Sequence, residues 1–167
     1  MSERHPLFAT SAAAGFTLIE VMVVLSILTA LATGISLSLD RVHARDSGRA
    51  LETLRLGLEV AAERAWIRGQ PVALERLDGG YRFLALGAGG QWAPVRDARV
   101  LGEHRLPLEV QWQAMEVEGR RLDVAQALVF AATAPSFRLT LSTPQGERHL
   151  LGTGAGKVML VNAEGAQ

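Results

Sequence analysis

The chain has no cysteine among its 167 residues, which excludes disulfides, cysteine-based zinc sites and thiol nucleophiles. It also lacks an excess of charge, because 17 Lys and Arg residues balance 17 Asp and Glu residues. No basic block stands out, so binding to nucleic acid through phosphate contacts is not expected. Apolar residues, in contrast, make up 49% of the chain, which is enough to bury the core of one domain.

Charge is almost absent from residues 16–39, FTLIEVMVVLSILTALATGISLSL, in which Glu20 is the one formally charged side chain. As a helix this stretch is roughly 36 Å long, against a hydrocarbon core of about 30 Å. The sequence therefore predicts a transmembrane helix over 16–39. A secretory signal peptide is disfavoured, because the run is too long and Asp40 follows it directly. The length also disfavours a buried core helix.

Glu20 does not suit a plain membrane anchor. An acidic side chain in the middle of a span costs about 2.5–3.5 kcal/mol on insertion scales. A position near the end of the span, or a partner, makes this cost tolerable. The carboxylate is therefore expected to have a function.

The residues Gly15-Phe16-Thr17-Leu18-Ile19-Glu20-Val21 resemble the processing signal of the type IV pilin and pseudopilin superfamily. The resemblance implies that a prepilin peptidase cuts after Gly15 and methylates the new N-terminus at Phe16. Residues 1–15 are then the leader peptide, which is longer and less basic than is common in the family. Glu20 becomes the fifth residue of the mature chain. The resemblance implies that it pairs with the Phe16 amine of a neighbouring subunit, so that burial of its charge fixes the stagger between helices.

The basic residues that follow the apolar run conflict with this orientation. By the positive-inside rule, Arg41, Arg45 and Arg49 would lie in the cytoplasm. In the pilin superfamily the leader is cytoplasmic when it is cut. We therefore expect residues 1–15 on the cytoplasmic side and the residues after 39 outside, which a reporter fused after Leu56 would test.

Residues 40–70 predict an amphipathic helix that continues into a globular head. Its apolar positions recur at spacings of three and four, which places them on one stripe; they are Leu51, Leu54, Leu58, Ala62 and Ala65. Gly57 is expected to weaken this helix slightly. Gly69 and Pro71 predict its end.

In residues 71–167 apolar and polar residues alternate with a period of two, which predicts a β-rich head domain. Val72–Leu77 and Tyr81–Leu86 predict a hairpin around Asp78-Gly79-Gly80. Strict alternation over 108–114 predicts a strand with Leu108, Val110, Trp112 and Ala114 on one face. Further strands are predicted over 122–131, 137–141, 148–151 and 157–161. The fold class is therefore α+β: a long N-terminal transmembrane and amphipathic helix packed on an antiparallel β-sandwich-like head.

The head resembles that of the H-type minor pseudopilins of type II secretion systems, which are related to FimT-like minor pilins. The segments that carry the resemblance are Ala50–Val72, Tyr81-Arg82-Phe83, Leu128-Val129-Phe130, Pro135–Leu141 and Gly156-Lys157-Val158. One departure is residues 131–134, which lack the Gly-Glu pair often found in this branch.

Catalytic patterns are weak, so neither an enzyme, a cofactor nor a metal site is expected. The histidines have no metal-ligand spacing; they are His5, His43, His104 and His149. The glycine-rich run 152–157 fails as a phosphate loop, because Leu151 replaces the first glycine and Val158 follows Lys157, so a hairpin turn is predicted. Glu116, Glu118 and Asp123 are expected in a solvated loop. Three tryptophans are expected to pack under the head; they are Trp66, Trp92 and Trp112.

The resemblance implies a structural minor pseudopilin, incorporated into the pseudopilus of a type II secretion system, at its tip, to support export of folded proteins across the outer membrane. The implied partners are other major and minor pseudopilins, the prepilin peptidase, an inner-membrane assembly platform and membrane lipid, without nucleic acid. The implied location is the bacterial inner membrane, crossed once, with the head in the periplasm.

Two other functions stay open at this point. One is a FimT-like minor pilin for type IV pilus assembly or DNA uptake. The DNA-uptake version is disfavoured because residues 161–167 contain Glu164 and no Lys or Arg. The other is a membrane-anchored periplasmic binding domain.

Overall fold

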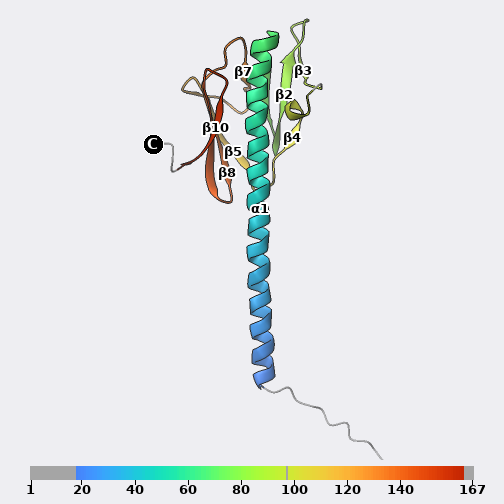
Figure 1. The fold of residues 1–167 in the computed structure, drawn as a ribbon, viewed down its shortest axis with the longest axis vertical. Coiled ribbons are helices and arrows are strands. Elements are labelled where there is room, and N and C mark those ends of the chain that lie inside the picture. The colour runs from blue at the N-terminus through green and yellow to red at the C-terminus, as the bar shows by residue number, and fades with distance from the viewer. Residues whose placement is uncertain (1–17, 97, 164–167) are drawn as a thin grey trace, which may run out of the picture. The chain divides into compact units, whose positions relative to one another are not determined.

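The computed structural model describes residues 18–96 and 98–163, and within 30–43 it describes the backbone alone. The chain divides into two compact units, Met1–Leu39 and Asp40–Gln167. The second unit, through its described residues, is called the head below. A long helix, α1 (Leu18–Arg68), comes first and is followed by strands and one short 3-10 helix, η1 (Arg99–Leu101) (Figure 1). The strands are β1 (Val72–Leu77), β2 (Gly80–Leu86), β3 (Trp92–Pro94), β4 (His104–Arg105), β5 (Gln111–Val117), β6 (Arg120–Arg121), β7 (Leu128–Phe130), β8 (Phe137–Thr143), β9 (Gly146–Gly152) and β10 (Val158–Asn162).

Two antiparallel sheets build the head. One has the order β3-β2-β1-β7 with β4 also paired to β2, and the other has the order β10-β9-β8-β5-β6. Figure 1 shows β2, β3 and β4 of the first sheet on one side of the head part of α1, and β5, β8 and β10 of the second sheet on the other. The predicted first hairpin is confirmed, with Val72 opposite Ala85 and Leu77 opposite Gly80. The predicted α+β class, a helix packed on antiparallel sheets, is confirmed as well.

The apolar stripe of α1 faces the core, as its spacing predicts. Leu51, Leu54, Leu58, Ala62 and Ala65 are all buried, and they join one hydrophobic cluster with residues of both sheets. The helix ends at Arg68, because Gly69 takes the left-handed conformation (φ 61°) that commonly terminates helices. Hydrophobic burial along this stripe is thus what holds the helix to the sheets.

Gly57 has a packing role that its low helix propensity conceals. A Cβ added at this position would lie 2.9 Å from the ring of Phe83 and 3.1 Å from the carbonyl oxygen of Val100. The absent side chain therefore lets β2 and η1 approach the helix closely. The small cost of glycine in a helix is offset by this contact.

The two sheets meet through aromatic side chains. Phe130 of β7 and Phe137 of β8 form an edge-to-face pair with ring centroids 5.8 Å apart, a favoured geometry for aromatic rings. Trp112 of β5 donates its indole N–H to the carbonyl oxygen of Gly80, at 3.0 Å. These contacts join one sheet to the other at two separate points.

The strand predicted over 108–114 is wrong in its start and in its facing pattern. The strand β5 begins at Gln111, and Leu108 is 93% exposed in the turn before it. A bulge between Trp112 and Ala114 shifts the register, so Ala114 pairs with Thr140, and Met115 is the buried residue. A bulge inserts one residue and reverses which side chains face inward, so alternation read across it fails.

The strand predicted over 122–131 is too long, because the observed strand, β7, contains only Leu128–Phe130. Before it, the backbone turns, with Gln126 N–H donating to the Asp123 carbonyl (3.0 Å) and Asp123 N–H donating to the Gln126 side chain (2.7 Å). Such local bonds compete with a strand ladder for the backbone groups. They explain why an apolar stretch with strand propensity forms a turn here.

Tyr81 is the one tyrosine of the chain and lies buried in β2, which makes it a probe of the core. Burial raises the pKa of its phenol well above the usual range. We therefore expect the folded protein to show no tyrosinate absorbance near pH 10, the approximate pKa of an exposed tyrosine. The same titration in urea should show it fully, and Tyr81→Phe should show none.

The sign of the pH effect follows from this pKa. The folded chain holds the phenol proton more tightly than the unfolded chain does. The contribution to folding stability is therefore complete below about pH 10 and is lost as the pH rises further. A tyrosinate signal near pH 10 in protein that is still folded would contradict the burial of this ring.

Candidate functional site

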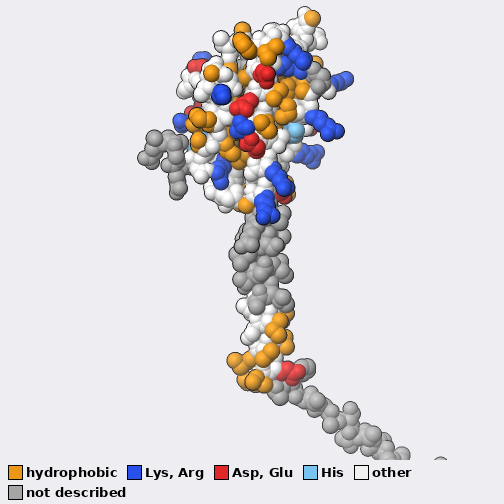
Figure 2. Space-filling model, viewed as in Figure 1, with side chains coloured by type: hydrophobic (Ala, Val, Ile, Leu, Met, Phe, Trp, Pro, Cys, Tyr) orange, Lys and Arg blue, Asp and Glu red, His pale blue; other side chains and the backbone are white. Residues whose placement is uncertain are grey.

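The first described turns of α1 form an apolar surface. The side chains of Leu18 to Thr29 are all exposed, and Glu20 is the one charged residue among them. Figure 2 shows hydrophobic side chains gathered on this stretch of the helix. Ser26 and Thr29 donate their hydroxyls to the carbonyls of Met22 and Leu25, at 2.8 Å each. Their polar atoms are thus satisfied within the helix, which suits a surface covered by lipid or by other helices.

Glu20 is the predicted site residue that the structure describes, and it lies in the first turn of α1. The predicted cleavage residues Gly15 and Phe16 lie outside the described residues. A membrane-crossing helix, judged by length and apolar character together, is not found in the described part of the chain.

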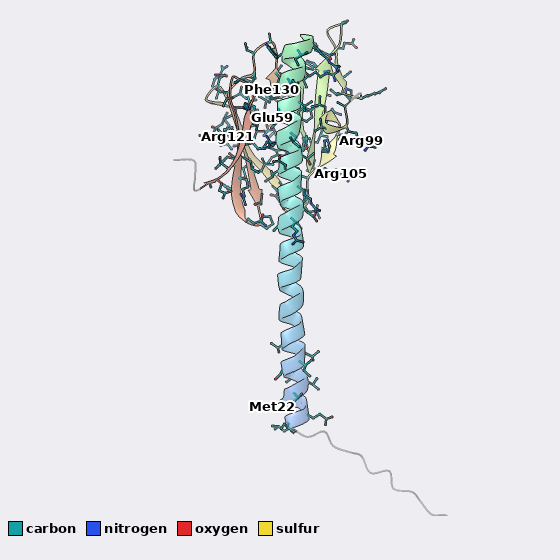
Figure 3. The ribbon with its side chains drawn as sticks, viewed as in Figure 1. Met22, Glu59, Arg99, Arg105, Arg121 and Phe130 are labelled. Carbon is teal, nitrogen blue, oxygen red and sulfur yellow. The ribbon has the colours of Figure 1, made fainter. Side chains whose placement is uncertain are left out.

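In the head, two side chains of α1 fasten the last strand. Glu59 Oε1 accepts a hydrogen bond from the Val158 N–H at 3.1 Å, and Arg55 donates to the Val158 carbonyl at 3.4 Å. Glu59 is labelled on α1 in Figure 3. Arg55 also pairs with Glu59 at 2.9 Å and donates three hydrogen bonds to Glu52. These bonds raise the pKa of Arg55 and lower that of Glu52. We call Arg55 and Glu59 the helix clamp, because they bond Val158 as a neighbouring strand would.

Removal of the helix clamp should destabilise the head. Glu59→Ala leaves the partly buried Val158 N–H without its acceptor, so we expect a loss of about 1–2 kcal/mol in the free energy of unfolding. Urea denaturation measures this loss as a lower midpoint. Glu63→Ala, at an exposed position one turn further along α1, is the matched control. Equal midpoints for the two variants would show that the helix clamp contributes nothing.

The residues considered for catalysis do not converge. His104 stacks on Tyr81 with ring centroids 5.2 Å apart, and His149 bonds Thr140 at 3.1 Å. The side chains of His5 and His43 lie outside those that the structure describes. No group of three or more His, Asp or Glu side chains that could hold a metal ion occurs among the described residues.

The glycine-rich run before Lys157 is a hairpin turn between β9 and β10, as predicted. Thr153 N–H donates to the Lys157 carbonyl at 3.0 Å, and Gly156 N–H donates to the Thr153 carbonyl at 2.9 Å. Two backbone N–H groups of this run are therefore engaged within the turn itself.

The two neighbouring carboxylates considered as a site, Glu116 and Glu118, lie in different local structures. Glu116 lies within β5, opposite Arg121 and Arg138, rather than in the predicted loop. Glu118 lies in the turn that follows, where its carboxylate accepts a hydrogen bond from the Ser136 N–H at 2.6 Å. Both carboxylates thus have partners within the fold: arginines lie opposite Glu116, and the Ser136 N–H bonds Glu118.

The predicted packing of the tryptophans under the head is wrong for two of the three. Trp66 is 73% exposed near the end of α1, and Trp92 is 42% exposed on β3, whereas Trp112 is half-buried. Trp66 borders a groove of about 530 Å³ between α1 and the loops around residues 133 and 155. Exposed tryptophans are typical of protein interfaces. Sequence spacing alone carried no signal for their exposure.

Comparison with known proteins gives three results. Residues 10–36, which include Gly15, Phe16 and Glu20, match the family described as the prokaryotic N-terminal methylation motif. No curated protein matches the chain in sequence. The fold of the chain is that of a pilin-like α+β protein, and two solved structures that it resembles are of a minor pseudopilin.

These structures are of EpsH, the minor pseudopilin from the type II secretion system of Vibrio cholerae. One is 17% identical in sequence with a TM-score of 0.55, and the similarity covers 70% of this chain and 97% of that one. A second is 16% identical with a TM-score of 0.55, covering 72% of this chain and 96% of that one. The resemblance to the pilin and pseudopilin superfamily is thus confirmed, at the N-terminus by the motif and in the head by the fold.

Proposed function

We propose that this protein is a structural minor pseudopilin of a type II secretion system, incorporated near the tip of the pseudopilus to support export of folded proteins. The observation that carries the proposal is the combination of the methylation motif over 10–36 with an EpsH-like head fold. Neither feature alone would suffice, since the motif occurs across pilins and a fold can host many functions.

The N-terminus has the central role in this proposal. Prepilin peptidase removes residues 1–15 and methylates Phe16, and residues 16–39 cross the inner membrane. The apolar side chains from Leu18 to Thr29, and hydroxyls satisfied by their own helix, support this role. In the filament, Glu20 pairs with the Phe16 amine of a neighbouring subunit.

The head, residues 40–167, lies in the periplasm under this proposal. It contacts other major and minor pseudopilins, while the inner-membrane assembly platform drives filament growth. The role is structural and not catalytic, which accords with the scattered positions of His104 and His149. Nucleic acid and cofactors have no part in it.

Mass spectrometry of the mature protein from its native host tests the proposal directly. We expect a chain that begins at N-methylated Phe16. A chain that retains Met1 would overturn the proposal and favour a membrane-anchored binding domain. Deletion of the gene should then abolish release of exoproteins; a loss of twitching or DNA uptake, with secretion intact, would indicate a type IV pilus protein.

A further inference from the structure

The last strand, β10, has an open edge. It pairs with β9 on one side, with Met159 opposite Leu151 and Val161 opposite His149, and no strand follows β10 on its other side in the described sheet. Along an antiparallel strand, one residue points both its N–H and its carbonyl at the neighbouring strand, and the next residue points both away from it. The helix clamp bonds the N–H and the carbonyl of Val158, so these groups point away from β9. The backbone groups of Leu160 and Asn162 therefore point to the same open side.

The short strands at the other sheet edges are protected in ways that β10 is not. The part of β5 that β6 leaves unpaired has its Met115 and Gln113 carbonyls engaged, by the Leu122 N–H at 2.8 Å and by the Arg121 side chain at 3.1 Å. The strand β3 has three residues and contains Pro94, β7 has three residues, β4 has two, and β6 consists of Arg120 and Arg121. Short length, proline and charge are the usual means by which proteins prevent edge pairing. The strand β10 has five residues, Val-Met-Leu-Val-Asn, without proline or charge. This edge is thus the one best suited to accept another strand.

The side chains around β10 define the chemistry of such a strand. Met159, which is 53% exposed, and Val161 lie on the outer face beside Leu151 of β9. Leu160 packs against the core on the opposite face. At the end of the strand, Arg148 donates to the Asn162 side chain, so the nearby cation is already engaged. A complementary strand is therefore uncharged and carries apolar side chains at alternate positions.

We propose that Leu160–Asn162 is a strand-addition site for an extended, uncharged segment of another pseudopilin. The proposal rests on the proposed function for the identity of the partner. The helix clamp closes the edge at Val158, so the incoming strand pairs only from Leu160 onward, through the N–H and carbonyl of Leu160 and of Asn162.

A second copy of this chain fits the edge less well. Two identical β10 edges pair antiparallel about a two-fold axis, which reverses one strand relative to the other. Because β10 runs alongside the head part of α1 (Figure 1), this pairing also reverses one head. Under the proposed function, copies within one filament share one orientation, which this pairing does not provide.

Residue-resolved amide exchange tests the site. The processed full-length chain, in detergent micelles, is mixed in turn with each of the other full-length pseudopilins of the same bacterium. We expect one of them to slow exchange of the Leu160 and Asn162 amides on the order of tenfold or more. The amides of Met159 and Val161, which already face β9, should change little.

Two variants remove the edge in different ways. Asn162→Pro deletes one open N–H, and Met159→Lys leaves the backbone intact but places a charge on the outer face. Both should abolish the protection, whereas Val124→Lys, at an 80% exposed loop position, should leave it unchanged. Thermal unfolding checks that each variant is folded.

Other outcomes overturn the proposal. A pseudopilin that binds while the Leu160 and Asn162 amides exchange as before would place the interface elsewhere and leave the proposed function standing. Protection that appears in the chain alone as its concentration rises would assign the edge to a second copy. Binding of no pseudopilin would reject the site, and the methylation state of Phe16, measured on the same sample, would report on the proposed function separately.

Discussion

A chain carrying Glu20→Gln is expected to be cleaved and methylated normally but to be nearly absent from the filament. The substitution keeps the size of the side chain and removes the charge that would neutralise the Phe16 amine of the neighbouring subunit. Loss of one partner from a buried ion pair costs about 3–5 kcal/mol. Since about 1.4 kcal/mol is a factor of ten, incorporation should fall roughly a hundredfold or more.

The measurement compares the amount of protein in sheared filaments with the amount in the membrane fraction, together with the mass of the mature N-terminus. Glu63→Gln, at a solvent-exposed position of α1, is the matched control and should assemble normally. Normal assembly of Glu20→Gln would show that the carboxylate does not set the stagger between subunits.

The second large effect is expected at Gly152, where β9 meets both β8 and β10. A Cβ at this position would lie 2.0 to 2.4 Å from three ring atoms of Phe137. That ring is buried and held edge-to-face against Phe130, so it has little room to move. Overpacking of a core typically costs about 1–3 kcal/mol, occasionally more, and we expect Gly152→Ala to be at least at the upper end.

Gly154→Ala, two residues further along the same hairpin, is the control, because its Cβ would meet no atom closer than 3.7 Å. Combining Gly152→Ala with Phe137→Leu should restore part of the lost stability, since the smaller side chain makes room for the methyl group. Urea denaturation reports both effects. Equal stability of Gly152→Ala and the parent chain would show that the Phe137 ring moves freely.

Local patterns in the sequence predicted the parts of the fold that local physics determines. The stripe from Leu51 to Ala65 follows from helix geometry, and the first hairpin follows from the turn residues Asp78-Gly79-Gly80. The bulge after Trp112 was not predictable, because it depends on how β5 meets β8. The turn over 122–127 depends on hydrogen bonds whose formation competes with pairing to other strands.

The N-terminal motif could be identified from sequence because several residue types occur at fixed spacing, whereas the surfaces of the head could not. The exposure of Trp66 and Trp92 depends on which other helices, strands and loops of the folded head cover them, and the local sequence does not contain this information. The helix clamp joins Glu59 to Val158 across 99 residues of sequence. Contacts of such separation leave no periodic trace in the sequence.

The helix clamp also bears on when the head can complete its folding. Arg55 and Val158 are 103 residues apart, and synthesis proceeds from the N-terminus. The helix is therefore made long before the strand that it fastens, and the sheet beside it stays incomplete until Val158–Asn162 emerge. Contacts between distant residues slow folding, because a long loop must close first. A nascent head thus depends on its final segment, and a chain that stops short of Val158 leaves the edge of β9 exposed.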